Sequence, residues 1–190
     1  MSNIYITGDM HLGHWSNSER NVIVYSNRPF DFIEEHDETL IDNWNSVVKD
    51  RDLVYINGDF SLTSVEKTKE YLDRLRGKKI MIVGDHDRQV WQCRDYFEEI
   101  TPYKVIKPGK KKIIIFHWCI RAWQQSHYNS YHAYAHSHGT LPPIGKSWDV
   151  GVDTEYKGIG HKKFFPYSLD EFLAIMKDRP DNPNLIWEKR

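Results

Sequence analysis

The sequence predicts an α/β fold in which two mixed β-sheets form a sandwich flanked by helices. In the first half of the chain, short apolar runs alternate with amphipathic stretches, which is typical of parallel strands joined by helical crossovers. The second half contains a hairpin pattern and further short apolar runs. Several runs also end in residues that bind metals or transfer protons, as expected where strand ends meet at one crevice.

Strands are expected where a short apolar run is bounded by turn residues. In the first half, where we expect parallel strands, the runs cover 4–7, 53–56 and 80–83. In the second half, where we expect antiparallel strands, they cover 103–107, 112–116, 131–134 and 148–152, and Pro108-Gly109-Lys110 turns the first two into a hairpin. No linker interrupts the pattern, so we expect residues 1–190 to form a single domain with a C-terminal tail at 180–190.

Helix starts are indicated by the capping-box pattern, in which a short polar residue is followed three positions later by Glu. Three pairs match it: Asp31 with Glu34, Thr63 with Glu66, and Ser168 with Glu171. We therefore expect a helix over 32–48, a second that Gly77 ends, and a third that runs through Lys177 and stops before Pro180.

The composition gives no global electrostatic signal. Among 190 residues, 26 Lys and Arg face 27 Asp and Glu, for a net charge of −1, so the charge does not indicate binding to nucleic acid or a membrane. The apolar run from Ile113 to Phe116 is far too short to cross a bilayer, and the early first strand leaves no room for a signal peptide. Two cysteines are a thin basis for disulfides. We expect a cytoplasmic protein.

Five segments at predicted strand ends carry the chemistry of the chain. They are Gly8-Asp9-Met10-His11, Gly58-Asp59, Gly84-Asp85-His86-Asp87, Phe116-His117 and Ala135-His136-Ser137-His138-Gly139. Asp9 and His11 can both turn to one ion, although an Asx-turn beside a surface histidine explains that pair equally well. The spacing of His136 and His138 suits two imidazoles that face adjacent ions. His117 ends an apolar strand, where a polar side chain needs a partner.

In this order, the five segments resemble the signature of the calcineurin-like metallophosphoesterases. Three further motifs are similar to that family, especially to its compact members from bacteria and their phages: Arg28-Pro29-Phe30, Asp42-Asn43-Trp44-Asn45 and Gly151-Val152-Asp153. The resemblance spans essentially the whole chain. It implies the single-domain sandwich of that family and the hydrolysis of phosphomonoesters or phosphodiesters by a metal-bound hydroxide, with two ions about 3.5–4 Å apart.

The resemblance also implies a role for each strand-end residue. The first ion is assigned to Asp9, His11 and His138, the second to Asp85, His117 and His136, and Asp59 is assigned as the bridge between them. His86 is assigned as the general acid, with Asp87 orienting its imidazole. The implied cofactor is a pair of divalent ions, Mn²⁺ ahead of Mg²⁺, Fe²⁺, Ni²⁺ or Zn²⁺. The implied partner is a phosphoester, with a nucleotide as one option.

Two positions depart from the family pattern. Asp85 stands where the family usually has Asn, and Ala135 where it usually has Gly. The extra carboxylate partly neutralises two divalent ions and removes an amide donor, so the site attracts phosphate less and favours Mn²⁺ or Mg²⁺ over Zn²⁺. The Cβ of Ala135 matters only where the backbone needs a positive φ.

Other polar side chains have weaker arguments. His14, three residues after His11, and Arg121, four after His117, are assigned to substrate phosphate, and an exposed or structurally paired side chain is the alternative for each. The lysines between Lys107 and Lys112 surround the Pro-Gly turn. Such a run is usually a solvated hairpin tip, with nucleic-acid contact as the alternative.

Two alternatives to a small-molecule phosphoesterase stay open. One is a nuclease or cyclic-nucleotide phosphodiesterase, which a long basic groove would indicate. The other is a metal-binding protein of the same fold with weakened catalysis, because Asp85 replaces the family Asn. The sequence does not predict the substrate or the oligomeric state.

Overall fold

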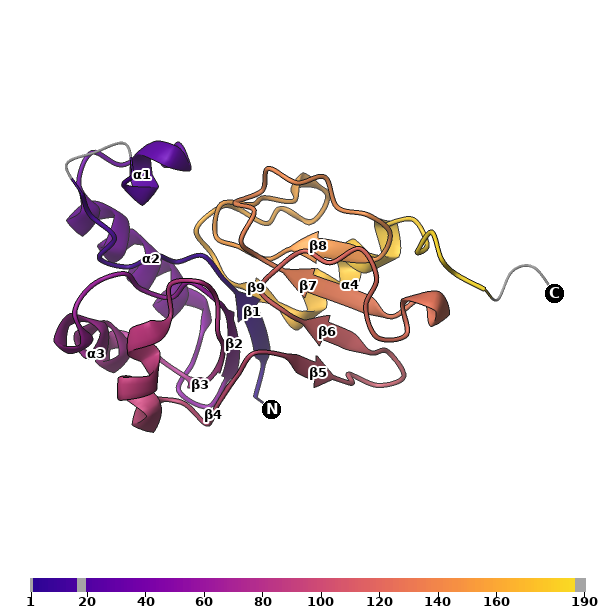
Figure 1. The fold of residues 1–190 in the computed structure, drawn as a ribbon, viewed down its shortest axis with the longest axis horizontal. Helices are drawn as coiled ribbons and strands as arrows, with labels where there is room; N and C mark the ends of the chain where they lie inside the picture. Colours follow the sequence, from indigo (N-terminus) through magenta and orange to yellow (C-terminus); the bar gives the residue numbers. More distant parts are fainter. Residues whose placement is uncertain (1, 17–19, 187–190) are drawn as a thin grey trace.

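The computed structural model describes residues 2–16 and 20–186, which form two β-sheets with helices on their outer sides (Figure 1). The first sheet has the strand order β4-β3-β2-β1-β9. Its members are β1 (Ile4–Thr7), β2 (Leu53–Asn57), β3 (Lys78–Ile82), β4 (Glu99–Thr101) and β9 (Tyr167–Ser168). Strands β1 to β4 are parallel, as predicted for the first three, and β9 pairs antiparallel with β1. Strands β4 (Glu-Ile-Thr) and β9 (Tyr-Ser) were not predicted, because neither consists of a run of apolar residues.

The second sheet has the order β5-β6-β7-β8, and it corrects the predicted strand directions. Its members are β5 (Lys104–Ile106), β6 (Ile113–Ile115), β7 (Tyr131–Tyr134) and β8 (Ser147–Asp149). The hairpin of β5 and β6 is confirmed, but β6, β7 and β8 are parallel rather than antiparallel. The long connections after β6 and β7 carry the chain back to the edge of the sheet at which the preceding strand began. The first connection contains the short 3-10 helix η2 (Ser126–Tyr128). The carboxyl ends of β6 and β7 therefore lie at one edge of the sheet.

Four α-helices and three 3-10 helices complete the described fold. They are α1 (Val22–Tyr25), α2 (Ile33–Val47), α3 (Val65–Arg74), α4 (Leu169–Asp178), η1 (Arg88–Tyr96), η2 and η3 (Lys157–Ile159). The capping box of Ser168 and Glu171 is confirmed, with both of its hydrogen bonds present. The other two were wrong: Phe32 precedes α2 without a side-chain cap, and Ser64 rather than Thr63 caps α3. At those helix starts the backbone enters the helix one residue later than the pattern suggests.

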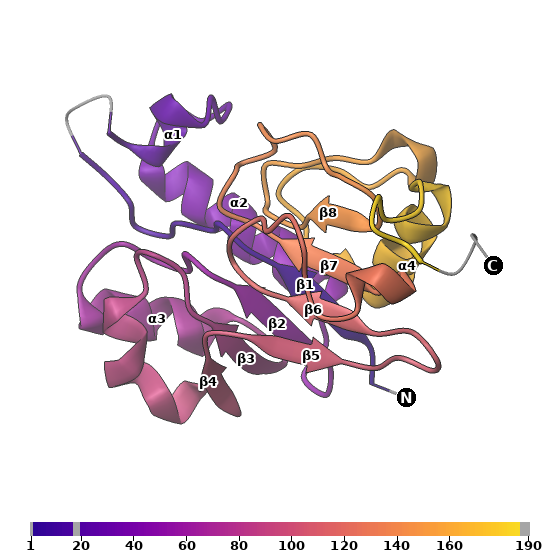
Figure 2. The ribbon, with the colours of Figure 1, turned by 45° about the vertical axis from the view of Figure 1, so that its right-hand side comes forward.

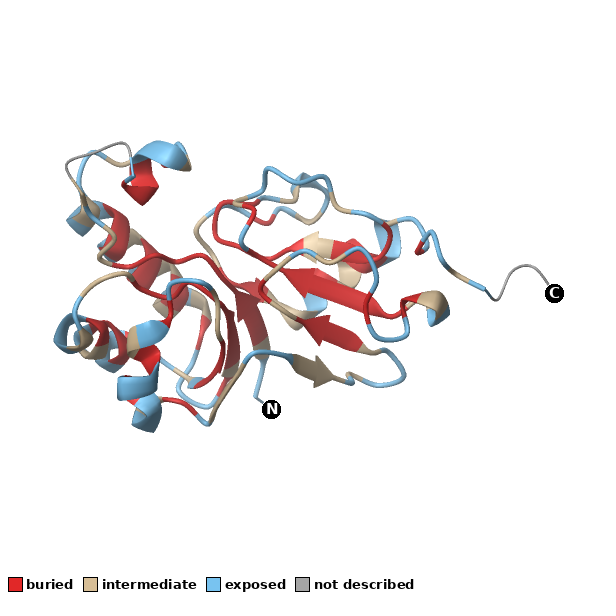
Figure 3. Cartoon of the chain, viewed as in Figure 1, coloured by how far each residue is buried: buried red, intermediate tan, exposed pale blue. Residues whose placement is uncertain are grey.

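Two hydrophobic clusters lie on opposite faces of the first sheet, because successive side chains of a strand point to opposite sides. In β2, Val54 and Ile56 pack with α2 and α3, whereas Tyr55 packs with the second sheet and α4. Both faces of the central strands are thus covered, which explains their continuous apolar sequences. Turning the molecule shows α2 and α3 beside β1 to β3 and α4 beside the second sheet (Figure 2). The strands are mostly buried and the helices bury one side (Figure 3).

The end of the described chain is anchored rather than loose. Asn182 is 2% exposed, and its side chain donates to the carbonyl groups of Ser126 and Ser130 and accepts from the backbone N–H of Lys146. Of the predicted tail, residues 187–190 lie outside the described residues. Within the part of the chain that is described, no helix combines the length and the apolar character needed to span a bilayer.

Candidate metal centre

Two clusters of metal-binding side chains lie at the carboxyl ends of strands from both sheets. Asp9, His11 and His138 bring three candidate ligand atoms within 4.8 Å of one another, and Asp59, His117 and His136 do the same. The chain after β1, β2, β6 and β7 supplies these residues. The parallel direction of β6 and β7 is what brings His117 and His136 to the same edge as Asp9 and Asp59.

Asp59, a member of the second cluster, also faces the first. Its Oδ2 atom is 3.6 Å from Nε2 of His11 in the first cluster and 3.5 Å from Nε2 of His117 in the second. The other carboxylate oxygen, Oδ1, accepts a hydrogen bond of 2.9 Å from the backbone N–H of His86. One oxygen of Asp59 thus faces a histidine of each cluster, which is the position that a bridging ligand requires.

The backbone at the clusters adopts a conformation that is rare outside glycine. The φ angles are 54° at Asp9, 51° at His11, 53° at Asp59, 65° at His136 and 47° at His138. Non-glycine residues seldom have positive φ, and each such residue costs of the order of 1–3 kcal/mol. Five strained residues gathered at one edge indicate a site at which function, rather than stability, selects the conformation.

Glycine keeps this edge narrow enough for the clusters to form. Gly58 has a φ of 85°, and a Cβ added there would lie 2.0 Å from Nδ1 of His117. A Cβ at Gly84 would lie 2.5 Å from Oδ1 of Asp59. Ala135, in contrast, is buried and is not among the residues with positive φ, so its departure from the family pattern causes no backbone strain.

Several buried ligand atoms lack a hydrogen-bond partner in the protein. They are Oδ2 of Asp9, Nδ1 and Nε2 of His11, and Nε2 of His117. A buried polar atom without a partner is costly, so such atoms are rare unless something binds them. Nδ1 of His117 donates to the carbonyl of Asn57 at 2.9 Å, so its Nε2, 3.5 Å from Oδ2 of Asp59, is the atom that can ligate a metal once it has lost its proton. The residues present therefore fit a pair of divalent cations.

The ionisation of these residues reflects the same environment. Burial raises the pKa of Asp9 to about 7 and lowers the pKa of His11 well below its usual value. Burial opposes the charged forms of Asp59 and His117 as well, but their mutual contact outweighs it, holding the pKa of Asp59 below its usual range and raising that of His117 to about 9. Metal ions compete with protons for such atoms, because only deprotonated groups ligate.

Asp85 lies outside both clusters but contacts one of their members. Its Oδ2 is 3.2 Å from Nδ1 of His136, and both side chains are nearly half exposed. The same oxygen accepts a hydrogen bond of 3.3 Å from Nε1 of Trp118. The structure thus places Asp85 beside the second cluster, at its solvent-facing side, rather than among the three groups that converge there.

His86 and Asp87 are adjacent in sequence but point to different surroundings. His86 is exposed, and its ring centroid lies 5.6 Å from that of His11, at the mouth of the site. Asp87 is 2% exposed, and its carboxylate accepts from the backbone N–H groups of Asp59, Phe60 and Gly84 at 2.7, 2.9 and 2.6 Å. Its partners are thus backbone groups rather than the His86 ring that it was predicted to orient. Asp87 holds the two loops that carry Asp59 and Asp85.

The two predicted phosphate contacts differ in position. The ring of His14 stacks on His11 with centroids 5.3 Å apart, and burial, aided by nearby His86, lowers the pKa of His14 to about 4. His14 is therefore a neutral ring at the site. Arg121 is exposed, and among the described residues the structure shows no hydrogen bond or ion pair for it. The structure brings His14 to the clusters and leaves Arg121 in solvent.

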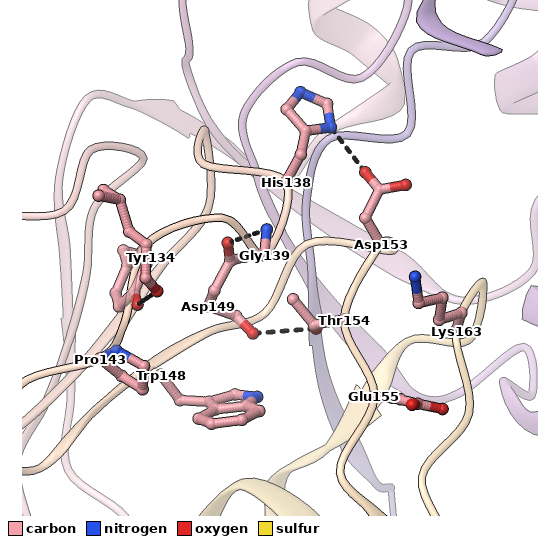
Figure 4. Close-up of a pocket in the computed structure, with 11 residues that line it drawn as sticks. Tyr134, His138, Gly139, Pro143, Trp148, Asp149, Asp153, Thr154, Glu155 and Lys163 are labelled. Atoms are coloured by element: carbon pink, nitrogen blue, oxygen red, sulfur yellow. Dashed lines mark hydrogen bonds and ion pairs between the residues drawn. The ribbon is translucent and has the colours of Figure 1, made fainter. Parts of the chain in front are cut away.

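Among the described residues, His138 lines at least two cavities. One, of about 530 Å³, also borders His136 and is walled by Tyr25, Asn27 and Leu141. The other, of about 270 Å³, lies on the side of His138 where Asp153 contacts it (Figure 4). Only the first borders a residue of each cluster, so it is the space next to the site that can hold the organic part of a substrate.

Sequence reasoning missed the side chains that support the clusters. The side chains of Arg28 and Asp153 are buried and bind the Asp9 carbonyl and Nδ1 of His138, and the backbone carbonyl of Asn57 accepts from Nδ1 of His117. Two of them stand in motifs noted above, Arg28-Pro29-Phe30 and Gly151-Val152-Asp153. A charged residue inside a motif of otherwise apolar or turn residues was the available signal.

Paired Asp and His clusters at the strand ends of a two-sheet α/β fold are a ligand arrangement suited to two-metal enzymes, a class that includes phosphatases and nucleases. The chain belongs to the calcineurin-like phosphoesterase family, whose model matches residues 2–189. The fold class predicted from the sequence is thereby confirmed. Metal dependence and phosphoester substrates are properties of that family.

Individual relatives are similar over different lengths. An uncharacterized protein of Methanocaldococcus jannaschii is 43% identical over 186 residues, covering 93% of each chain. The gene 66 protein of Mycobacterium phage L5 is 36% identical over 110 residues, which are 56% of this chain and 50% of the phage protein. Among solved structures, a protein of unknown function from Aquifex aeolicus has a TM-score of 0.68 at 22% identity, covering 92% of this chain and 100% of that one. This structural similarity shows the fold alone.

Proposed function

We propose that this protein is a dinuclear metal-dependent phosphoesterase that hydrolyses a phosphomonoester or phosphodiester. The observation that carries the proposal is the position of Asp59, whose Oδ2 faces Nε2 of His11 at 3.6 Å and Nε2 of His117 at 3.5 Å. In the proposed assignment, Asp9, His11 and His138 hold one ion, His117 and His136 hold the other, and Asp59 serves both. When bound, two divalent ions activate water and stabilise the charge that develops on the phosphoryl group.

The remaining residues bind and move protons around that centre. His86 stands at the mouth of the site, where an exposed imidazole can donate a proton to a departing oxygen. His14, neutral and stacked on His11, is positioned to donate a hydrogen bond to a phosphoryl oxygen. Asp87 holds the loops so that Asp59 and His86 keep this arrangement.

The adjoining cavity favours a small phosphoester over nucleic acid. Its lining of Tyr25, Ser26, Asn27, His136, Ser137, His138, Thr140 and Leu141 contains no Lys or Arg. A nuclease usually tracks the phosphate backbone with a basic groove. The lysines of the β5–β6 hairpin do not supply one here, because they lie at the end of β6 opposite His117. A compact organic group with neutral polar atoms suits the lining better.

Hydrolysis that depends on added metal tests the proposal. Protein stripped with EDTA is assayed against p-nitrophenyl phosphate, bis-p-nitrophenyl phosphate, cyclic nucleotides and short DNA and RNA, with and without Mn²⁺, the ion that we expect to serve best. We expect hydrolysis of at least one monoester or small diester only when Mn²⁺ is present. In crystals soaked with Mn²⁺, anomalous diffraction is expected to give two peaks ~3.5–4 Å apart at Asp59. A single peak, or peaks elsewhere, refutes the dinuclear assignment.

A second candidate, a metal-binding protein with weakened catalysis, is favoured by the position of Asp85. Its carboxylate lies beside His136 at the edge of the proposed second ion, where a negative charge opposes the binding of a phosphate dianion. We expect Asp85→Asn to raise kcat by about 10–100-fold, the gain from about one transition-state hydrogen bond. Asn keeps an acceptor for Trp118, so local packing is preserved.

The measurement is kcat of the Mn²⁺-loaded variant with the best substrate of the screen. Asp50→Asn is the matched control, because Asp50 is exposed and precedes β2, at the end opposite Asp59. A lower kcat in Asp85→Asn, with Asp50→Asn unchanged, means that the carboxylate is an adapted part of the site.

A further inference from the structure

A single buried arginine contacts the first cluster in two ways: directly through the cluster's backbone, and indirectly through a carboxylate that binds one of the cluster's side chains. Arg28 is 4% exposed, and all five of its N–H donors have acceptors. Nε and Nη2 bind the carboxylate of Asp153 in a bidentate pair, each at 2.8 Å. The other donors bind the carbonyl of Asp9 at 2.6 Å, the carbonyl of Met10 at 3.1 Å and Nε2 of His36 at 2.6 Å.

The two carbonyls that Arg28 binds belong to the peptide groups between Asp9 and His11. Both of these residues have positive φ, so the short segment that joins them is strained. A planar guanidinium donates to both peptide groups at once and holds them in the orientation that points Asp9 and His11 at each other. A lysine has a single nitrogen and no fork, so it cannot reproduce this set of bonds.

Asp153 extends the contact to the third member of the cluster. Its Oδ2 accepts from Nδ1 of His138 at 2.6 Å, and Oγ of Ser26 lies 3.0 Å from the same nitrogen. Because Nδ1 carries the proton, Nε2 of His138 is left to act as a ligand, and the ring cannot rotate freely. Arg28 and Asp153 together thus contact Asp9 and His138 and hold the backbone next to His11.

On the side that faces away from the first cluster, Arg28 is held by hydrogen bonds to buried residues of the core. His36 accepts from Arg28 at Nε2, so its Nδ1 carries a proton and donates to Asp37 at 2.8 Å. Burial lowers the pKa of His36, in keeping with this neutral ring. Asp37 also accepts from the backbone N–H of Gly13 and from the hydroxyl of Tyr71. A continuous buried chain therefore links the first cluster to α2 and α3.

The second cluster is supported by other groups: the carboxylate of Asp87 accepts from the backbone N–H of Asp59, and the carbonyl of Asn57 accepts from Nδ1 of His117. Among the described residues, none of the hydrogen bonds of Arg28 or Asp153 reaches Asp59, His117 or His136. The side chain of His136 is 47% exposed, against 14% for His138. The two clusters thus differ in what holds them: a buried ion pair supports the first, whereas the second leaves the side chain of His136 open to solvent.

We propose that Arg28, acting through Asp153 and the Asp9–His11 backbone, is a positioning residue that sets the metal affinity of the first cluster and not of the second. The proposal rests on the dinuclear site proposed above. It assigns a purpose to a motif, Arg28-Pro29-Phe30, that the proposed chemistry leaves unexplained. It also makes the second ion the one that exchanges with solvent more readily.

The test is Mn²⁺ binding to wild type and to Arg28→Lys, measured by calorimetry on metal-free protein. Wild type is expected to bind two ions. In Arg28→Lys the affinity for one ion is expected to fall about 10–100-fold, the usual cost of losing a partner behind a metal ligand, while the other affinity is unchanged. Anomalous diffraction at limiting Mn²⁺ is expected to show the remaining ion between Asp59, His117 and His136. Activity is not needed for this readout.

Arg74→Lys is the matched control, because Arg74 makes a similar bidentate pair with Glu38 on the exposed surface. Asp153→Asn provides a second variant if Arg28→Lys does not fold, since it keeps an acceptor for His138 but removes the charge that pairs with Arg28; it is expected to lose the same ion. If both affinities fall equally in a folded variant, or neither does, the inference is overturned. A wild-type protein that binds no ion overturns the proposed function instead.

Discussion

Asp59→Asn is expected to weaken the binding of both metal ions and to reduce hydrolysis by about 10³-fold or more. Among the described residues, the Oδ2 atom of Asp59 is the carboxylate oxygen that faces Nε2 of both His11 and His117. An amide in its place brings no negative charge and offers only one oxygen. Loss of several kcal/mol of metal-derived transition-state stabilisation corresponds to a rate effect of this size.

The substitution separates a bridging role from a structural one. An Asn carbonyl still accepts the hydrogen bond from the backbone N–H of His86, so the local loop contact is retained. Metal content is measured by elemental analysis after dialysis, with the free energy of unfolding measured in parallel. His136→Ala is the comparison variant, because it removes a ligand of the second cluster alone and is expected to leave one ion bound. If Asp59→Asn retains one ion with unchanged affinity, Asp59 does not bridge.

The placement of the candidate ligands at strand ends was predictable from local sequence, whereas their roles came from the family resemblance and stay predictions. Each of the six residues lies within four positions of the end of a recognisable strand, so placing the strands places the residues: Asp9, His11, Asp59, His117, His136 and His138. The strained backbone at these positions was not predictable, because Asp and His carry no sequence signal for positive φ comparable to glycine. The sequence therefore predicts where the candidate ligands lie better than it predicts their backbone conformation.

The parts that failed depend on contacts between distant residues. Arg28 and Asp153 are 125 positions apart, and nothing in either local sequence indicates that they pair. Asp87 was assigned to its neighbour His86, whereas its partners include the backbone of Asp59, which lies 28 residues earlier. The directions of β7 and β8 were wrong for a related reason, since irregular connections hide whether the chain crosses over or turns back.

His86→Ala is expected to reduce the hydrolysis of an alkyl or nucleoside phosphoester by about 10²–10⁴-fold, the usual contribution of general acid catalysis. An alkoxide leaving group, such as a ribose oxygen, is a strong base and must receive a proton as the ester bond breaks. The ring of His86 is exposed at the mouth of the site, 5.6 Å from the ring of His11, where it can meet that oxygen. p-Nitrophenolate is a weak base and needs little protonation.

The expected result is therefore a loss that depends on the leaving group. The variant retains most activity toward p-nitrophenyl phosphate, and its metal content is unchanged because the backbone N–H that contacts Asp59 remains. Kinetics with both esters, at the same Mn²⁺ concentration, measure the difference. Equal losses on both substrates with intact metal content mean that His86 binds phosphate instead of protonating the leaving oxygen. Loss of metal places His86 among the ligands and overturns its assignment as the general acid.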